Sequence, residues 1–390
     1  MDKNILIFSK SVGTKHGGSL ILDATVQSLV ADGWEVKIAT ESNTYDNEEV
    51  DLIVINNFYS KNVGKFFWKI FDIAAVIRVV NRETVILVNG DLPRLTYILL
   101  QLFFVVIFSR QDNILTCPAN NRVLSRGRTI CVKPVGFSCL AVNRIEGCLT
   151  GIGLIQSIGR IVFRMRDRYL LRLIKNFLCL SEQSLRSHDR SGRVIYPPLL
   201  AKEAPRPIGR DLHRLVFCGR LDGVKGGIDV VAALRMLPDY YSLIVLGDGP
   251  ERRSLERSAE TWGIRDRVEF RGWVGMRERD EVFASVGAIV VPSIWDEAFG
   301  MIGIEAFAQG TPAVAYEVGG IPEWCRQPAG ILVRVGDVGA LSEAVLAATR
   351  DPLDWKKRSA AARRIASEFS RERFERDLET MLDHALRKAS

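Results

Sequence analysis

The stretch PSIWDEAFGMIGIEAFAQGTPAVAY, from Pro292 to Tyr316, decides the fold of the region around it. The apolar run GAIVVP that leads into it predicts a buried strand, and a helical pattern begins near Phe299. Glu297 is therefore expected in the loop at the strand's carboxyl end, the edge where open α/β sheets bind ligands. Glu305 follows about two turns into the helix, close enough to contact a second part of an extended ligand.

The first turn of this predicted helix has the character of an anion site. Its amides have no partner within the helix, so they suit a phosphate group. Carboxylates for hydroxyl groups beside amides for phosphate are what a bound nucleotide sugar requires. The alternative is a pair of solvated helix-end glutamates, but the flanking Gly300, Gly310 and TPAVAYEVGG favour a binding site. The residues expected to supply the amides are Phe299, Gly300, Met301 and Ile302.

A second informative block is LVFCGRLDGVKGGIDVVAAL, Leu215 to Leu234. Its strand pattern ends at Gly219 and Arg220, and Lys225 opens an amphipathic helix. Two cations at a strand end and a helix start can neutralise a diphosphate as its bond to a sugar breaks. Arginine supplies a planar fork and lysine a compact charge, so both suit one diphosphate. The alternative is two ordinary surface cations among the 53 lysines and arginines of the chain.

These blocks, together with SLIVLGDGPERRSLE, resemble the retaining glycosyltransferase family 4 within the glycosyl transferases group 1. The family signature has a Glu, a nearby Phe-Gly, a second Glu after seven intervening residues, then Gly-x-Pro and Gly-Gly. The resemblance implies that Glu297 contacts the donor sugar and Glu305 the nucleotide ribose. It also implies that Glu297, Arg220 and Lys225 are the catalytic residues, with both cations at the pyrophosphate.

The same resemblance implies an α/β protein with the GT-B architecture, which has two facing Rossmann-like domains and an interdomain cleft. It implies a hexosyltransferase or related enzyme that retains anomeric configuration. The donor would be a UDP- or GDP-linked sugar, and the acceptor a saccharide or a polyprenol-linked saccharide. The expected role is the biosynthesis of a surface polysaccharide, lipopolysaccharide or lipid-linked oligosaccharide.

The amino-terminal end also matches the family pattern. NILIFSK reads as a buried strand, followed by a loop that ends in His16, Gly17 and Gly18 and by a helix from about Ser19 to Ala31. Glycines at such a turn let the backbone approach a phosphate or a sugar ring, although most Gly pairs only shape a turn. Within the family pattern this loop faces the cleft, which makes Gly17 and Gly18 donor-binding candidates and His16 a candidate contact of the acceptor or the donor sugar.

One position departs from the family. Many relatives carry a His-Asp pair six residues ahead of a Cys-Pro, and here RQDNILTCP places Gln111 and Asp112 at that spacing. Glutamine can hydrogen-bond a sugar hydroxyl but cannot exchange a proton near neutral pH. If the histidine is essential to the chemistry, this chain is impaired; if it orients the donor sugar, Gln111 can substitute. Both residues are candidate contacts of the acceptor or the donor sugar.

The chain of 390 residues is longer than one core usually organises, so two domains are expected. Strand and helix patterns alternate through residues 1–195, as in a parallel doubly wound sheet. Residues 196–213 hold four prolines and no periodicity, which predicts a linker. Alternation resumes over residues 214–370. In similar transferases the last helix, here 371–390, crosses back onto the first domain.

Composition excludes several classes of protein. At 47% hydrophobic and 25% charged residues the chain is globular, and no basic patch interleaved with aromatic residues indicates nucleic acid. No compact Asp-x-Asp pair is present for a divalent ion, and the family needs neither metal nor cofactor. The seven cysteines include no C-x2-C pair. Cys131, Cys139 and Cys148 share one loop, where reduced thiols are expected rather than zinc.

The sequence also bears on location. MDKNILIF runs straight into the first strand, so no signal peptide is expected and the interpretation is a cytoplasmic enzyme. The most apolar window, Leu95 to Phe108, is shorter than the roughly 20 residues of a spanning helix, and predicts a helix to about Gln101 and then a buried strand.

A run of arginines predicts an amphipathic helix with a cationic face, which would hold the protein peripherally at an anionic membrane. The alternative is a surface helix packed on its own domain, with solvated arginines. The stripe consists of Arg160, Arg164, Arg168, Arg172 and Lys175, and between them lie Ile161, Phe163, Leu170, Leu171 and Ile174.

Two other functions remain open at this point. A nucleotide-sugar epimerase of the same fold would isomerise the donor without an acceptor, and the Glu pair with GR…KG argues against it. A catalytically silent, donor-binding partner of another transferase would explain Gln111, whereas the intact Glu297, Arg220 and Lys225 argue for activity.

Overall fold

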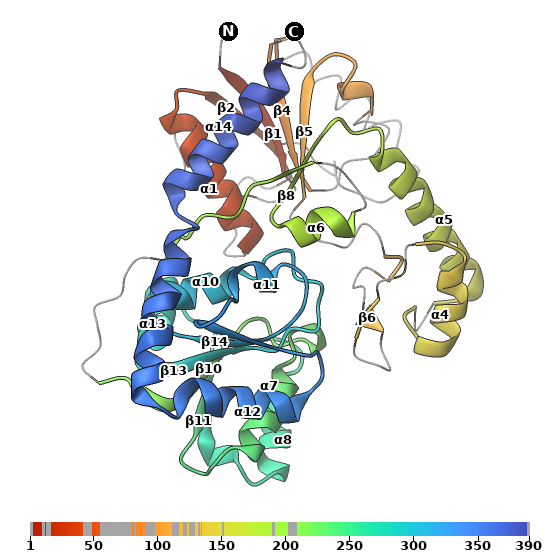
Figure 1. Cartoon of the computed structure of the whole chain (residues 1–390). Helices are drawn as coiled ribbons and strands as arrows, with labels where there is room; N and C mark the ends of the chain where they lie inside the picture. The colour runs from red at the N-terminus through yellow and green to blue at the C-terminus, as the bar shows by residue number, and fades with distance from the viewer. Residues whose placement is uncertain are drawn as a thin grey trace. The chain divides into compact units, whose positions relative to one another are not determined.

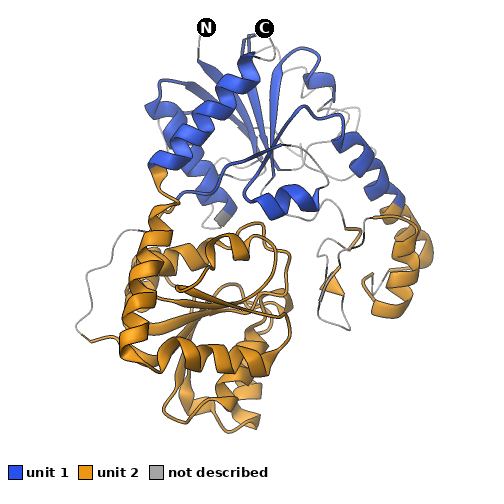
Figure 2. Cartoon of the chain, viewed as in Figure 1, with its two compact units in different colours: residues 1–116, 162–198, 372–390 blue, residues 117–161, 199–371 orange. Residues whose placement is uncertain are grey.

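The computed structural model shows two compact units, each with its own parallel sheet (Figures 1 and 2). Unit 1 comprises residues 1–116, 162–198 and 372–390, and unit 2 comprises residues 117–161 and 199–371. The structure describes residues 3–9, 12, 17–41, 49–54, 80–81, 83–90, 98–110, 117–119, 123–124, 129–131, 133, 135–149, 152–188, 192–201 and 209–387.

The sheet of unit 1 has seven strands, all paired in parallel. Its strands are almost wholly apolar because helices cover a parallel sheet on both faces. In spatial order they are β3 (Asp51–Val54), β2 (Glu35–Thr40), β1 (Asn4–Ser9), β4 (Val85–Asn89), β5 (Val105–Arg110), β8 (Asn176–Cys179) and β9 (Arg193–Val194). The chain adds β1 to β3 toward one edge of the sheet and β4 to β9 toward the other edge. The strand order therefore reverses between β1 and β4, which is the switch point of this sheet.

Helices α1 (Gly17–Ala31), α5 (Leu154–Leu171), α6 (Glu182–Ser187) and α14 (Arg371–Arg387) accompany this sheet. The C-terminal helix α14 returns to unit 1, where it lies beside α1 (Figure 1). Ser28 Oγ on α1 donates a hydrogen bond to Glu375 Oε1 on α14 at 3.3 Å. α14 buries Phe374, Leu378, Met381 and Leu382, because these residues repeat at three- and four-residue spacing on one helical face.

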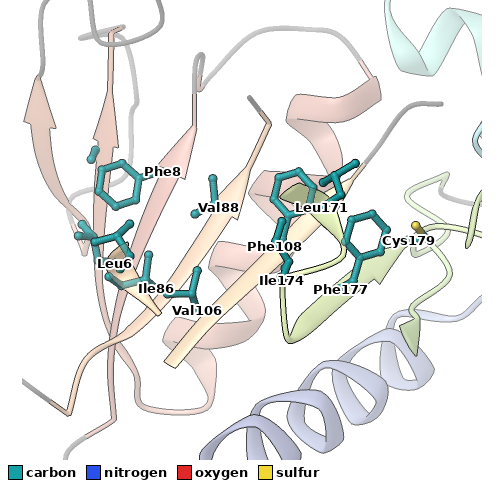
Figure 3. Packing of buried hydrophobic residues seen from close by; sticks show 12 residues of the cluster. Leu6, Phe8, Ile86, Val88, Val106, Phe108, Leu171, Ile174, Phe177 and Cys179 are labelled. Atoms are coloured by element: carbon teal, nitrogen blue, oxygen red, sulfur yellow. The ribbon is translucent and has the colours of Figure 1, made fainter. Parts of the chain in front are cut away.

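A cluster of twelve buried residues forms the core beside the sheet (Figure 3). Its strand residues include Phe8, Val88 and Phe108, and the ring centroids of Phe108 and Phe177 lie 5.3 Å apart. Leu171 at the end of α5 belongs to the same cluster. The carboxyl end of α5 is therefore anchored in the core of unit 1.

Unit 2 has a six-stranded sheet, again parallel throughout. In spatial order its strands are β12 (Val268–Gly272), β11 (Ser242–Leu246), β10 (Asp211–Cys218), β13 (Val286–Val291), β14 (Ala313–Tyr316) and β15 (Gly330–Val333). The helices of this sheet are α7 (Gly227–Met236), α8 (Arg252–Thr261), α9 (Met276–Ser285), α10 (Met301–Ala308), α11 (Ile321–Trp324), α12 (Val338–Thr349) and α13 (Pro352–Ser367).

Arg210 ties the amino end of the central strand β10 to its neighbours in unit 2. Its guanidinium donates to the carbonyl oxygens of Val286 at 2.9 Å and Gln309 at 2.8 Å, and it stacks 4.8 Å from the Trp355 ring. Burial, together with the charge of Arg363, lowers the pKa of Arg210 to about 10. One side chain thereby joins the start of β10 to β13, to the end of α10 and to α13.

The α/β class and both parallel sheets agree with the sequence prediction, and each predicted strand is present within a few residues. The structure adds a hairpin of β6 (Val123–Leu124) and β7 (Thr129–Ile130), followed by α4 (Ser138–Glu146). The sequence did not reveal the hairpin because strands of two residues show no periodicity. The predicted linker and the interdomain cleft stay predictions.

The structure exposes only part of the cationic stripe that the sequence predicts on α5. Arg160, Arg172 and Lys175 are exposed, whereas Arg164 and Arg168 are partly buried. The predicted role of the stripe at a membrane stays a prediction.

Arg164 lies in the middle of the stripe, yet its side chain is only 13% exposed and pairs with the buried Asp167 at 3.7 Å. Ile161, on the same side of the helix, is fully buried. The opposite side carries Ile155, which is 86% exposed, and Tyr169, which is 65% exposed. A repeat of four residues advances only about 40° per step, so the stripe drifts across the buried side instead of lying on a separate polar face.

Candidate functional site

The candidate site lies at the point in the sheet of unit 2 where the chain stops adding strands on one side and begins to add them on the other. β10 and β13 are neighbours, and the chain continues from β10 toward β12 on one side and from β13 toward β15 on the other. In open α/β sheets, ligands bind outside the carboxyl ends of the strands at such a switch point. The two loops that leave these strand ends carry Arg220 and Lys225 on one and Glu297 on the other.

The loop after β10 is held by backbone hydrogen bonds to the segment that follows β11. The Leu221 amide donates to the Asp248 carbonyl oxygen at 2.9 Å, and the Leu221 carbonyl accepts from the Glu251 amide at 3.0 Å. A short 3-10 helix, Gly223–Lys225, then leads into α7. Arg220 forms an ion pair with Asp222, and its side chain remains 72% exposed. The guanidinium is thus positioned in the loop while it stays accessible to a ligand.

Lys225 and Glu297 meet directly, although 72 positions separate them in sequence. Lys225 Nζ lies 2.5 Å from Glu297 Oε1, and Ser293 Oγ donates to the same oxygen at 2.9 Å. The two loops are also joined by the Ile294 amide, which donates to the Val224 carbonyl at 2.9 Å. The side chains of Lys225 and Glu297 are 33% and 14% exposed. The structure therefore brings one predicted cation and one predicted carboxylate into a single fixed pair.

Two glycines allow the loops to approach so closely. Gly226 has φ +70°, and a Cβ there would lie 1.9 Å from the Pro292 carbonyl oxygen. Gly319 has φ +50°, and a Cβ there would lie 2.0 Å from the Glu297 carbonyl oxygen. The next amide, that of Gly320, donates to this same Glu297 oxygen at 2.8 Å. Any larger residue would force the loop of Glu297 away from its neighbours.

The loop continues into α10 through an unusual start. Gly300 caps the helix in the left-handed region at φ +84°, and Met301 and Ile302 begin the first turn. Their amides are the ones that an α-helix leaves without an intrahelical acceptor. Phe299 is buried and its ring lies 5.2 Å from that of Phe369, so it can serve a ligand only through its backbone. The predicted phosphate amides thus stand at one helix start beside Glu297.

Trp324 is a supporting residue that the sequence did not reveal. Its indole nitrogen donates to the Phe299 carbonyl at 2.8 Å, and its ring is fully buried. A Cβ on Gly303 would lie 1.9 Å from this ring, so only glycine lets α10 approach it. The Trp-Gly pair fixes the turn that precedes α10. Its only sequence signal is a tryptophan one turn after the Gly-Gly of the family pattern.

Glu305 is placed differently from Glu297. It is 3% exposed, and its Oε2 lies 3.0 Å from Arg279 Nη1 on α9. Arg279 also binds Asp280 at 2.8 Å, so two carboxylates share one buried cation. Burial raises the pKa of Glu305 to about 7, although Arg279 opposes the shift. The carboxylate is engaged within unit 2, and its implied role toward the ribose stays a prediction.

The remaining predicted residues belong to unit 1. Gly17 and Gly18 form the first turn of α1, directly after the loop that follows β1. This places them at the switch point between β1 and β4, the position in unit 1 that corresponds to the loop of Arg220 in unit 2. His16, Gln111 and Asp112 lie outside the described residues, so their predicted roles stay predictions.

All seven cysteines are free thiols in the structure, and the described residues hold no group of three His, Cys, Asp or Glu side chains that is arranged to bind a metal. Cys139 and Cys148 lie close enough to Cys117 and Cys131 for electrostatic interaction between the thiol groups. Burial raises the pKa of both thiols, with smaller contributions from these neighbours. A raised pKa favours the protonated thiol over the thiolate that binds metal.

Comparison with known families identifies the second unit. The model of the family "Glycosyl transferases group 1" matches residues 202–367, which contain Arg220, Lys225, Glu297 and Glu305. Residues 202–367 form a glycosyl transferases group 1 domain. The group 1 domain covers almost all of unit 2 that follows the hairpin and α4, and its match supports the family resemblance drawn from the sequence.

Curated relatives align over part of the chain. A 2-deoxystreptamine glucosyltransferase of Streptomyces kanamyceticus is 31% identical over 158 residues, which are 39% of this chain and 41% of that protein. The lipopolysaccharide core biosynthesis glycosyltransferase LpsE of Rhizobium meliloti is 31% identical over 185 residues, 47% of this chain and 52% of that protein. The chain thus spans about half or less of the length of these relatives.

Solved structures resemble the whole chain in fold. The structure of the HepE protein of Anabaena in complex with UDP and glucose has a TM-score of 0.70 at 17% identity. The alignment covers 98% of this chain and 100% of the HepE chain. Sucrose-phosphate synthase of Thermosynechococcus elongatus has a TM-score of 0.71 at 20% identity, with full coverage of both chains. These likenesses confirm the predicted fold class of two Rossmann-like α/β sheets.

Proposed function

We propose that this protein is a retaining glycosyltransferase that transfers a sugar from a nucleotide-diphosphate donor to a saccharide or lipid-linked acceptor. The observation that carries the proposal is the 2.5 Å pair of Lys225 and Glu297 at the sheet's switch point, beside the start of α10. A cation for a diphosphate and a carboxylate for sugar hydroxyls stand there side by side, inside a glycosyl transferases group 1 domain.

In the proposed reaction the bond between the anomeric carbon and the diphosphate oxygen breaks, and a bond from that carbon to an acceptor oxygen forms on the same face. The acceptor hydroxyl gives its proton to the departing diphosphate oxygen. The departing diphosphate gains negative charge, which Arg220, Lys225 and the first amides of α10 would stabilise. Glu297 would hold the donor sugar while its pairing with Lys225 fixes the ammonium in place. Such stabilisation supplies the role of a metal ion, so we propose a reaction independent of metal and cofactor.

The donor and the setting are proposed on the comparisons. HepE is described in complex with UDP and with UDP-glucose, which favours a UDP-linked donor here, with GDP as the second choice. LpsD and LpsE are described as lipopolysaccharide core glycosyltransferases, which favours a role in surface polysaccharide biosynthesis. We propose that the protein works in the cytoplasm at the inner face of the membrane. The described helices include none with the length and apolarity to cross a bilayer.

The first experiment measures the thermal stability of the purified protein with UDP, GDP or ADP. A nucleotide at one hundred times its Kd raises the stability of the folded state by about 2.7 kcal/mol, so the matching base is found by its shift. The second experiment uses the matching nucleotide sugars and measures transfer to saccharide acceptors in EDTA. Transfer that depends on added divalent metal would contradict the proposed mechanism.

Variants then test the site itself. Lys225→Ala and Arg220→Ala should each lower kcat by roughly 10²–10³, as removal of one charge-stabilising donor does elsewhere. Arg277→Ala is the matched control, because this arginine is 92% exposed on α9 and pairs with Glu281 at 3.0 Å, away from the candidate site. Unchanged turnover in Arg220→Ala and Lys225→Ala would overturn the proposal.

The same assay separates the two alternatives. An epimerase would isomerise the donor or release nucleotide without forming a glycoside, whatever acceptor is supplied. A silent partner would bind UDP in the thermal experiment yet form no product alone. Glycoside formation by the purified chain excludes both.

A further inference from the structure

Asp222 lies between the two cations of the candidate site in sequence and contacts both of them. Its carboxylate forms an ion pair with the Arg220 guanidinium, and its amide donates to the Arg220 carbonyl oxygen at 2.9 Å. Its own carbonyl oxygen accepts a hydrogen bond from the Lys225 amide at 3.1 Å. One residue therefore holds the guanidinium of Arg220 through its side chain and the backbone of Lys225 through its main chain.

The side chain of Asp222 does not serve the helix that it precedes. Asp222 is the N-cap of the 3-10 helix Gly223–Lys225, but its carboxylate accepts no capping hydrogen bond. An aspartate at an N-cap normally accepts one from an amide of the first turn. Asp337 does so at α12, where its carboxylate accepts from the Ala340 amide at 2.9 Å. The carboxylate of Asp222 is turned to Arg220 instead.

This orientation contributes little to the stability of the fold. The side chain of Arg220 is 72% exposed, and an ion pair with such an exposed partner stabilises a protein only weakly. Asp222 Oδ1 is buried and has no hydrogen-bond partner among the described residues, which is unfavourable for a carboxylate oxygen. An arrangement that gains little stability at one oxygen and loses some at the other is typical of a functional site.

The ion pair restricts a side chain that would otherwise be free to move. An exposed arginine has many rotamers, and ordering it during the reaction would cost free energy. Leu221, which lies between Arg220 and Asp222, is held by backbone hydrogen bonds at both its amide and its carbonyl, so the carboxylate stands on a fixed loop. Glu297 holds Lys225 in the same way, at 2.5 Å. Each of the two cations thus has its own carboxylate.

We propose that Asp222 is a positioning residue, which presents the Arg220 guanidinium to the diphosphate of the donor. This inference rests on the proposed function, because it assigns a role at the same diphosphate site. Negative charge grows on the departing diphosphate as its bond to the sugar breaks. A guanidinium that is already ordered stabilises this charge without reorganisation. Asp222 touches no reacting atom and acts through Arg220.

The test is a double-mutant cycle in the transfer assay, with Arg220→Ala, Asp222→Asn and the combined variant. Asp222→Asn removes the charge and keeps the size of the side chain, so it should lower kcat by about tenfold, through misplacement of the guanidinium. In the Arg220→Ala background the same substitution should change kcat by less than about twofold, because the residue through which Asp222 acts is absent.

The matched control is Asp239→Asn. Asp239 is exposed, pairs with Arg267 at 3.2 Å and precedes β11, at the opposite end of the parallel sheet from Arg220. Its kcat should stay within about twofold of wild type, since an exposed ion pair contributes little. The melting temperature of Asp222→Asn should lie within about 3 °C of wild type, because its carboxylate adds little stability.

Three results would overturn this inference alone. They are an unchanged kcat in Asp222→Asn, an equal loss of kcat in both backgrounds, and a fall in melting temperature beyond the expected range, which would make Asp222 a structural residue. A wild-type chain that binds no nucleotide, or an Arg220→Ala variant with full turnover, contradicts the proposed function and this inference with it. The two failures are therefore distinguishable.

Discussion

Helices α5 and α14 have nearly the same length and the same strong separation of apolar and charged residues, yet the structure turns them in opposite directions. α14 buries Phe374, Leu378 and Met381 and exposes acids and arginines. α5 exposes Ile155 and Tyr169 and keeps Arg164 on its inner side. Both helices carry the periodicity of a surface helix.

The contrast shows what amphipathicity does and does not predict. The pattern identifies residues that share a helical face, but not whether that face meets the core or an external partner. α14 packs beside α1, and its apolar face is buried within unit 1. α5 packs its inner side through Ile161, Leu171 and the ion pair of Arg164 with Asp167. Its outer side, which includes Ile155 and Tyr169, stays exposed. Four predictions test this comparison.

The largest effect is expected from two neighbouring residues of α5. Ile161→Asp should lower the free energy of unfolding by about 4 kcal/mol or more, because it buries an unpaired charge at a fully buried position. Val162→Asp should change it by less than about 0.5 kcal/mol, since Val162 is 49% exposed. Urea midpoints of both variants measure the difference. Equal destabilisation would show that α5 does not have the orientation described.

The second test compares a leucine on each helix. Leu378→Ala on α14 should cost about 3 kcal/mol of stability, because Leu378 is buried against the rest of unit 1. Leu173→Ala, which removes the same atoms from a residue that is 48% exposed beside α5, should cost less than about 1 kcal/mol. Thermal unfolding of the pair is the measurement. A larger loss for Leu173→Ala would reverse the comparison.

A third test concerns α10, another helix that buries a charged residue. The pKa of Glu305 is about 7, raised from 4.5, so the folded chain holds a proton there that the unfolded chain has released. This contribution to stability is present at low pH and is lost as pH rises from 4.5 to 7. Relative to wild type, Glu305→Gln should therefore gain stability on the order of 2 kcal/mol between pH 5 and pH 8.

Melting temperatures of wild type and Glu305→Gln across this range give the measurement. Because the two chains differ only at Glu305, the other titrating groups cancel in the comparison. Parallel curves would show that Glu305 titrates at its ordinary pKa, and would contradict the upward shift that burial causes here.

The smallest effect compares two ion pairs. Asp167→Asn on α5 should cost about 1.5 kcal/mol, because Asp167 is 3% exposed and its loss leaves the Arg164 charge buried. Asp377→Asn on α14 breaks a pair of Arg373 and Asp377 whose side chains are about 40% exposed, and should cost less than about 0.5 kcal/mol. Urea unfolding resolves the two. If both variants lost the same free energy of unfolding, burial would not determine how much each ion pair contributes to stability.

Much of the candidate site could be predicted because it is local. Arg220, Lys225 and Glu297 each follow an apolar strand, and strand runs and turn glycines are visible in a single sequence. The contact of Lys225 with Glu297 spans 72 positions. The family resemblance implied only that both residues face the same donor, not that they pair. Trp324 behind Phe299 and Arg279 beside Glu305 were missed, since no local pattern marks a partner that approaches from another element.

The sequence by itself determined the order of strands and helices, the loops that bear the charged residues, and the residues that share each helical face. Only the tertiary structure decided that Glu297 binds Lys225, that Glu305 is enclosed with Arg279, and that the apolar side of α5 faces outward. The physical reason is that periodicity arises from the geometry of one segment. Burial and pairing depend on which distant segments pack against it. In α5 the core of the chain packs against the inner side, so the apolar residues of the outer side stay exposed.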